Sequence, residues 1–150
     1  MDSYPDSAYF LLSGIIEPSE LTDAEKADYG YLTALYHSEE GKAMAEDGII
    51  LFSLGYYKDH NVTEKLVTTY ILAGQYYSWN DDLQMATTMW KGGLDLALEM
   101  KDSVMIPIIC RGMAENYFSK KEYQNAITSF RQTLEYVSDH SSIYYMTGLS

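Results

Sequence analysis

The chain has 150 residues, of which 47% are hydrophobic and 21% are charged, enough for one folded domain with a substantial core. Ten Lys and Arg residues against 22 Asp and Glu residues give a formal net charge of -12, which repels phosphate backbones and anionic lipids. Composition therefore argues against nucleic-acid binding and against adsorption to a membrane surface, whereas a basic protein segment would be attracted.

Several missing features narrow the chemistry further. No apolar run approaches the roughly 18 residues of a transmembrane helix, so we expect no membrane insertion by this segment. The single cysteine, Cys110, is expected to be a small buried hydrophobe. The three histidines lie near expected helix ends: His37, His60 and His140. Their positions are explained by the favourable interaction of a histidine with the C-terminal end of a helix. With no glycine-rich phosphate loop and no nucleophile pattern, we expect no enzyme, no metal site and no cofactor.

Helix signals in the first half of the chain come in three groups. Residues 5–16 carry apolar side chains at helical spacing behind Pro5, a residue that suits the first turn of a helix. Thr22 and Glu25 have the form of a capping box, which predicts a helix to about residue 37. A third helix is expected to start near Glu46 or Asp47 and to stop at residues 59–60.

Cap and turn signals delimit the helices in the second half: Asn61 with Glu64, residues 79–82, Asp102 with Ser103, and residues 119–122. They predict a fourth to a seventh helix. Pro107 stands inside the sixth, where a proline removes a backbone donor, so a kink or a late start near Ile106 is expected. An eighth helix is expected to begin near Ser141 or Ser142.

A pattern of small and large side chains recurs after 40 residues. The hairpin over residues 67–100 has small residues that let two helices approach, Gly74, Ala86 and Gly93, and large ones that fill the space between them, Tyr70, Tyr77 and Trp90. Five of these positions recur as Cys110, Ala114, Tyr117, Ala126 and Phe130. A repeated two-helix unit indicates a solenoid, in which each hairpin buries its apolar face by stacking on its neighbours.

The single domain, residues 1–150, then divides into degenerate N-terminal helices (1–60), one repeat (61–101), a second repeat (102–140) and a last segment (141–150). The fold class that we predict is all-α, an α-solenoid of antiparallel helix hairpins with seven or eight helices. The last segment is either a terminal cap or the first part of a further repeat, and its unpaired face could also drive self-association.

The repeat resembles the tetratricopeptide repeat (TPR), whose signature positions are W, L, G, Y, A, F, A and P. The first copy departs from the signature at Ala73 and Leu98, and the second copy departs at Cys110, Thr133 and Ser138. A standard repeat has 34 residues, so the 40-residue spacing implies longer helices or a longer link. The resemblance implies a right-handed solenoid whose concave surface is lined by the first helix of each hairpin.

On that resemblance, the side chains that face a partner groove come from three helices: Asp28, Tyr31 and Leu35 in the degenerate copy; Thr68, Ile71, Gln75 and Ser78 in the first repeat; and Ile108, Arg111, Glu115 and Phe118 in the second. This mixture of aromatic, aliphatic and polar side chains could hold a peptide segment. The alternative is that these residues face solvent or a neighbouring helix.

The segments SYPDSAYFLLSGI, LTDAEKADYGYLTAL and EDGII are similar to helical repeat regions of Bacteroides-type cell-envelope proteins, which follow a lipoprotein or other secretory signal and can lead into a signalling module. That resemblance implies the periplasmic side of the envelope; a cytoplasmic location is the alternative. We predict a non-enzymatic scaffold or sensor that docks a partner peptide or domain. The alternative is a small-ligand or carbohydrate-binding component of an envelope lipoprotein system, in which Trp79 and paired tyrosines stack on sugars.

Overall fold

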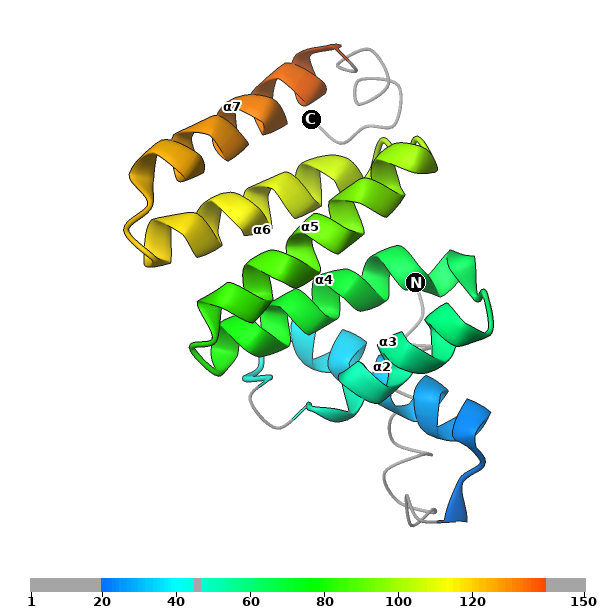
Figure 1. The fold of residues 1–150 in the computed structure, drawn as a ribbon. Helices are drawn as coiled ribbons and strands as arrows, with labels where there is room; N and C mark the ends of the chain where they lie inside the picture. The colour runs from blue at the N-terminus through cyan, green and yellow to red at the C-terminus, as the bar shows by residue number, and fades with distance from the viewer. Residues whose placement is uncertain (1–19, 45–46, 140–150) are drawn as a thin grey trace.

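A computed structural model describes residues 20–44 and 47–139. These residues form six α-helices and no strand (Figure 1): α2 (Asp23–Glu39), α3 (Ile49–Asp59), α4 (Thr63–Trp79), α5 (Leu83–Glu99), α6 (Met105–Ser119) and α7 (Tyr123–Asp139). The predicted all-α class is confirmed for this part of the chain. The helices expected over residues 5–16 and from residue 141 onwards lie outside the described residues.

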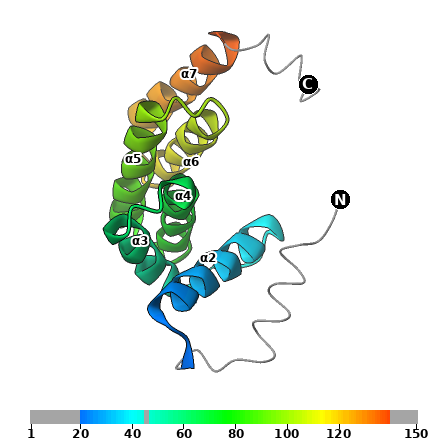
Figure 2. The same ribbon diagram turned by 90° about the vertical axis from the view of Figure 1, so that its right-hand side faces the viewer.

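Each helix packs mainly against the helices that precede and follow it in the chain. Figures 1 and 2 show a stack with α2 at one end and α7 at the other. Alternate helices also touch, because α4 contacts both α2 and α6. The contacts between alternate helices bring α2, α4 and α6 together, and these are the helices from which the expected groove residues come.

The turns between helices repeat with a period of 20 residues. A left-handed backbone conformation, with φ between 54° and 63°, occurs at five positions: Gly41, Asn61, Asp81, Lys101 and Lys121. Helices α2 to α6 each end in the same pair of hydrogen bonds; after α4, the Asp81 N–H donates to the Ser78 carbonyl (3.2 Å) and the Asp82 N–H to the Tyr77 carbonyl (2.9 Å). This is the Schellman arrangement, which satisfies the last free carbonyls of a helix.

Two of the predicted helix starts are confirmed. The Thr22 Oγ1 accepts from the Glu25 N–H (3.3 Å) and the Glu25 Oε2 accepts from the Thr22 N–H (2.9 Å), so the capping box is present. The Asp102 Oδ1 accepts from the Met105 N–H (3.0 Å), and α6 begins at that residue. Pro107 therefore stands in the first helical turn, where its missing N–H costs no helical hydrogen bond.

Two other predicted starts are wrong in detail. Asn61 does not cap α4, because it occupies the left-handed turn position, and α4 begins at Thr63 without a side-chain cap. The third helix begins at Ile49, later than expected. The carboxylate of Asp47, buried two residues before that start, instead lies 2.8 Å from the Nδ1 of His37 and ties the segment to α2.

The packing of α4, α5 and α6 centres on Trp90, which is 5% exposed. A Cβ atom added to Gly74 would lie 2.8 Å from the Trp90 Cε2, and one added to Gly112 would lie 2.6 Å from its Cη2. The indole thus fills the space that two glycines leave on α4 and α6. Cys110 is buried in the same core, as predicted, and its burial raises the pKa of its thiol.

Candidate functional site

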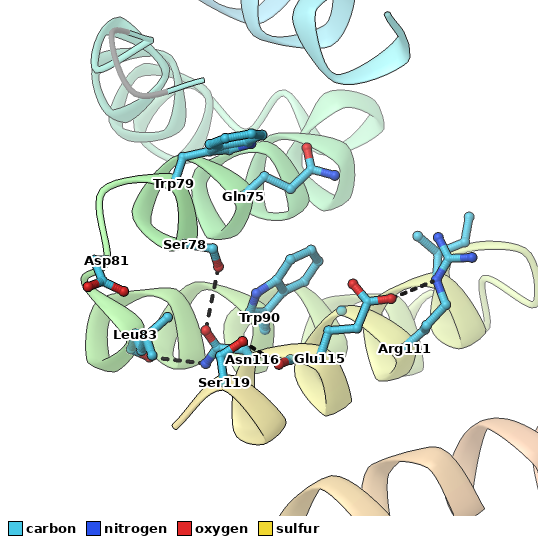
Figure 3. A pocket seen from close by; sticks show the side chains of 12 residues that line it. Gln75, Ser78, Trp79, Asp81, Leu83, Trp90, Arg111, Glu115, Asn116 and Ser119 are labelled. Carbon is cyan, nitrogen blue, oxygen red and sulfur yellow. Dashed lines mark hydrogen bonds and ion pairs between the residues drawn. The ribbon is translucent and has the colours of Figure 1, made fainter. Parts of the chain in front are cut away.

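A cleft of about 400 Å³ opens between α4 and α6 (Figure 3). Its lining residues come from α4, α5, α6 and the turn between α4 and α5: Gln75, Ser78, Trp79, Asp81, Leu83, Trp90, Ile108, Arg111, Gly112, Glu115, Asn116 and Ser119. In Figure 3, Trp90 rises from α5 between the two walls. The volume is within the range of small-ligand pockets and suits one or two side chains of a larger partner.

The cleft is held in shape by the buried amide of Asn116. Its Nδ2 donates to the Leu83 carbonyl (3.1 Å) and to the Thr87 Oγ1 (2.6 Å), both on α5. On the other side, the Ser78 Oγ on α4 lies 3.5 Å from the Asn116 Oδ1. One side chain thereby connects the three helices that form the cleft, so the spacing between its walls is fixed by hydrogen bonds as well as by apolar packing.

Two buried polar atoms in the cleft have no hydrogen-bond partner among the described residues. They are the indole Nε1 of Trp90, a donor, and the amide Oε1 of Gln75, an acceptor. A buried polar atom without a partner costs about 1–3 kcal/mol. Both residues line the cleft, but the two atoms are enclosed by the protein, so a molecule in the cleft pairs with either atom only if the side chain first moves.

The charges at the cleft are exposed and only loosely paired. The Arg111 Nε lies 3.8 Å from the Glu115 Oε1, and both side chains are about two-thirds exposed. Such a surface pair contributes little to stability and leaves both groups available to a ligand. Asp81 adds a second carboxylate, and the indole of Trp79, 54% exposed, also lines the cleft.

The structure brings together five of the residues that the sequence indicated: Gln75, Ser78, Ile108, Arg111 and Glu115 all line the cleft. The expectation for Ile71 was wrong, since its side chain is 7% exposed and belongs to the core. Phe118 does not line the cleft; it is exposed and its ring lies 5.6 Å from that of Tyr123. Thr68 is half-buried and also lies outside it.

The three residues expected on α2 belong to a different cluster. The Asp28 Oδ1 accepts from the Tyr57 Oη (2.6 Å) and from the Lys65 Nζ (2.7 Å), which ties α2 to α3 and α4. Partial burial raises the pKa of Asp28, but the hydrogen bonds from Lys65 and Tyr57 outweigh it and hold the pKa below its usual range. Tyr31 packs edge-on against Tyr57, and Leu35 packs against the apolar core beside them.

Sequence reasoning missed three important cleft residues: Trp90, Gly112 and Asn116. Trp90 was assigned to the core alone, although its ring edge also reaches the cleft. Gly112 had a usable signal, because a glycine inside a helix opposite a large aromatic marks a close approach. Asn116 had no such signal in the sequence, because a single asparagine in a helix does not indicate which carbonyl its side chain will bind.

Other kinds of site are not evident in residues 20–44 and 47–139. No three His, Cys, Asp or Glu side chains gather there as a metal would require. None of the described helices has the length and apolar character needed to cross a membrane. No protein-family model matches the chain, and no curated protein matches it.

Proposed function

We propose that the chain is a non-enzymatic interaction module that docks a segment of a partner protein in the cleft between α4 and α6. The observation that carries the proposal is the lining of the cleft, which places the exposed indole of Trp79 beside the charged groups of Arg111 and Glu115. A peptide segment can place an apolar side chain against the indole and polar or charged groups against the rim. No bond is made or broken in this function.

We further propose that the helices belong to a TPR-like α-solenoid, with α4–α5 and α6–α7 as two repeats. The 20-residue spacing of the left-handed turns supports equal helix–turn units. Contacts of α4 with α2 and α6 support a surface formed by alternate helices. In such an array the cleft lies where two neighbouring repeats meet, so its width follows the curvature of the stack.

Charge favours a basic partner segment. The chain has a net charge of -12, and Asp81 and Glu115 place carboxylates on the cleft, whereas Arg111 is the one base among its described lining residues. Attraction between opposite charges would speed association and select among partners more than it would tighten binding. A segment with a Lys or Arg beside a small apolar residue would match the cleft in both charge and volume.

A second candidate function is supported by Trp79. An exposed indole beside a carboxylate and an amide, here Asp81 and Gln75, is suited to stacking on a sugar ring and hydrogen bonding its hydroxyl groups. A carbohydrate ligand would also fit the cell-envelope location that the sequence resemblance implies. This candidate uses the same cleft, so variants of the cleft test both.

The test is a selection of a random peptide library, displayed on phage, against the purified chain. Enriched peptides are measured by titration calorimetry against the wild type, Trp79→Ala and Glu115→Lys. Glu135→Lys, an exposed glutamate on α7 away from the cleft, is the matched control. We expect a loss of about tenfold or more in affinity for both cleft variants and none for the control.

Peptides that bind all four proteins equally would refute docking in the cleft. A glycan array probed with the same proteins separates the second candidate. If no peptide is enriched, and a glycan binds the wild type but not Trp79→Ala, then the ligand of the cleft is a sugar rather than a peptide.

A further inference from the structure

A stripe of four large apolar side chains is exposed along α7: Tyr123, Ile127, Phe130 and Leu134, which we call the α7 stripe. Leu134, the most open of them, is 70% exposed. Their spacing of four, three and four residues places them on one face of the helix. Phe118 extends the apolar patch beyond the start of α7, through its ring contact with Tyr123. Exposed apolar patches of this kind mark interaction surfaces.

The repeat relates this stripe to a face that is buried elsewhere in the molecule. Forty residues earlier, the same positions on α5 are Leu83, Thr87, Trp90 and Leu94. That face of α5 packs on α6: Asn116 bonds to the Leu83 carbonyl and the Thr87 hydroxyl, and Trp90 fits against Gly112. The α7 stripe is therefore the equivalent of a helix-docking face. Among the described residues, α7 packs mainly on α6, which lies on another side of it.

We propose that the α7 stripe is the interface of a homodimer, in which α7 packs antiparallel against α7 of a second copy. The four-three-four spacing is that of the a and d positions of a coiled coil. With the two-fold axis between Thr128 and Ser129, Ile127 faces Phe130 of the second copy and Tyr123 faces Leu134 of the second copy. Each layer then pairs one aromatic ring with one branched aliphatic side chain. The stripe is thus self-complementary, as a two-fold interface requires.

The local charge supports a second copy as the occupant. From Tyr123 to Leu134 there is no acidic residue and one basic residue, Arg131, in a chain that has 22 acidic residues in all. Two chains of charge -12 can therefore meet along this acid-free stretch of α7 with little local repulsion.

The test is analytical ultracentrifugation of the full 150-residue chain over a concentration series. We expect a dimer for the wild type and a dissociation constant at least about tenfold weaker for Leu134→Lys and for Tyr123→Glu, because each places two charges against apolar side chains. Leu98→Lys is the control, since Leu98 is a half-exposed leucine on α5 outside the stripe, and it should dimerise like the wild type. Circular dichroism melting confirms that each variant is folded.

The decisive arm is a mixture of Leu134→Lys and Tyr123→Glu. In a mixed antiparallel pair the new Lys of one copy meets the new Glu of the other, while the remaining three layers are unchanged. Mixing should therefore restore association by at least about tenfold over either variant alone. A monomeric wild type, equal dissociation of the Leu98→Lys control, or a mixture that stays apart would each overturn the proposal.

Discussion

Replacing Gly112 by alanine tests whether Trp90 is as tightly held as its contacts indicate. The added Cβ would lie 2.6 Å from the Trp90 Cη2 and 2.8 Å from its Cζ2 and Cζ3. The ring cannot simply withdraw towards α4, because a Cβ at Gly74 would already lie 2.8 Å from the Cε2. The clash must therefore be relieved by moving α6 or by tilting the indole out of its buried position.

The size of the effect follows from two opposing contributions. In a helix, alanine is favoured over glycine by about 1 kcal/mol. Overpacking of a buried site costs about 1–3 kcal/mol, and a rigid ring enclosed by two helices puts Gly112 at the upper end of that range. We expect a net loss of about 1–2 kcal/mol, which lowers the melting temperature by about 3–6 °C in a domain of this size.

The assay is urea denaturation followed by far-UV circular dichroism, which gives the free energy of unfolding for each variant. Gly55→Ala is the matched control, because Gly55 is also a helical glycine but has no atom within 4 Å of its added Cβ. That variant should gain about 0.5–1 kcal/mol. If Gly112→Ala were stabilised to the same extent, the tight enclosure of Trp90 would be refuted.

Two further predictions concern the turns and the link between α2 and α4. Lys101→Gly should stabilise the fold by about 1 kcal/mol, because Lys101 has a φ of 54°, a backbone conformation that favours glycine. Lys91→Gly is the control: Lys91 is exposed in the interior of α5, where glycine should destabilise the fold by about 1 kcal/mol. Thermal melting of both variants measures the two opposite effects. Asp28→Asn should lose about 1 kcal/mol at pH 7, measured by urea denaturation, with Asp95→Asn as the control for removal of one exposed charge. The pKa of Asp28 is lowered in the fold from its usual value of 3.8, so the stabilising effect of its carboxylate is fully present above pH 3.8. The effect is lost as the pH falls through the lowered pKa, so the difference in stability between the wild type and Asp28→Asn should shrink as the pH falls below 3.8. A difference that persists unchanged at pH 3 would contradict this assignment.

Most of the helical framework could be predicted from local chemistry. The capping box of Thr22 and Glu25 and the cap of Asp102 satisfy N–H groups within their own helix turn, so the sequence alone contains both partners. The 40-residue pattern likewise placed Gly74 and Trp90 on facing helices. The 20-residue period of the turns was missed, because four of its five left-handed positions are occupied by Asn, Asp or Lys and only Gly41 has the expected residue.

The candidate site was predicted only in part, because it depends on rotation of helices about their axes. Ile71 and Gln75 are one helical turn apart on α4, yet the first is in the core and the second lines the cleft. A small rotation of the helix decides which side of that boundary a residue occupies, and periodicity does not fix it. The bonds of Asn116 to α5 join residues about 30 positions apart, so no local signal announces them.

The sequential packing of the helices has a consequence for how the molecule folds and opens. Each helix contacts partners that are at most two helices away along the chain, so contacts close short loops and folding should be fast for a protein of this length. Opening should begin at an end of the stack rather than in its middle. Because α7 packs mainly on α6, its amide hydrogens should exchange with solvent sooner than those of α5, and any molecule that covers α7 should slow that exchange first.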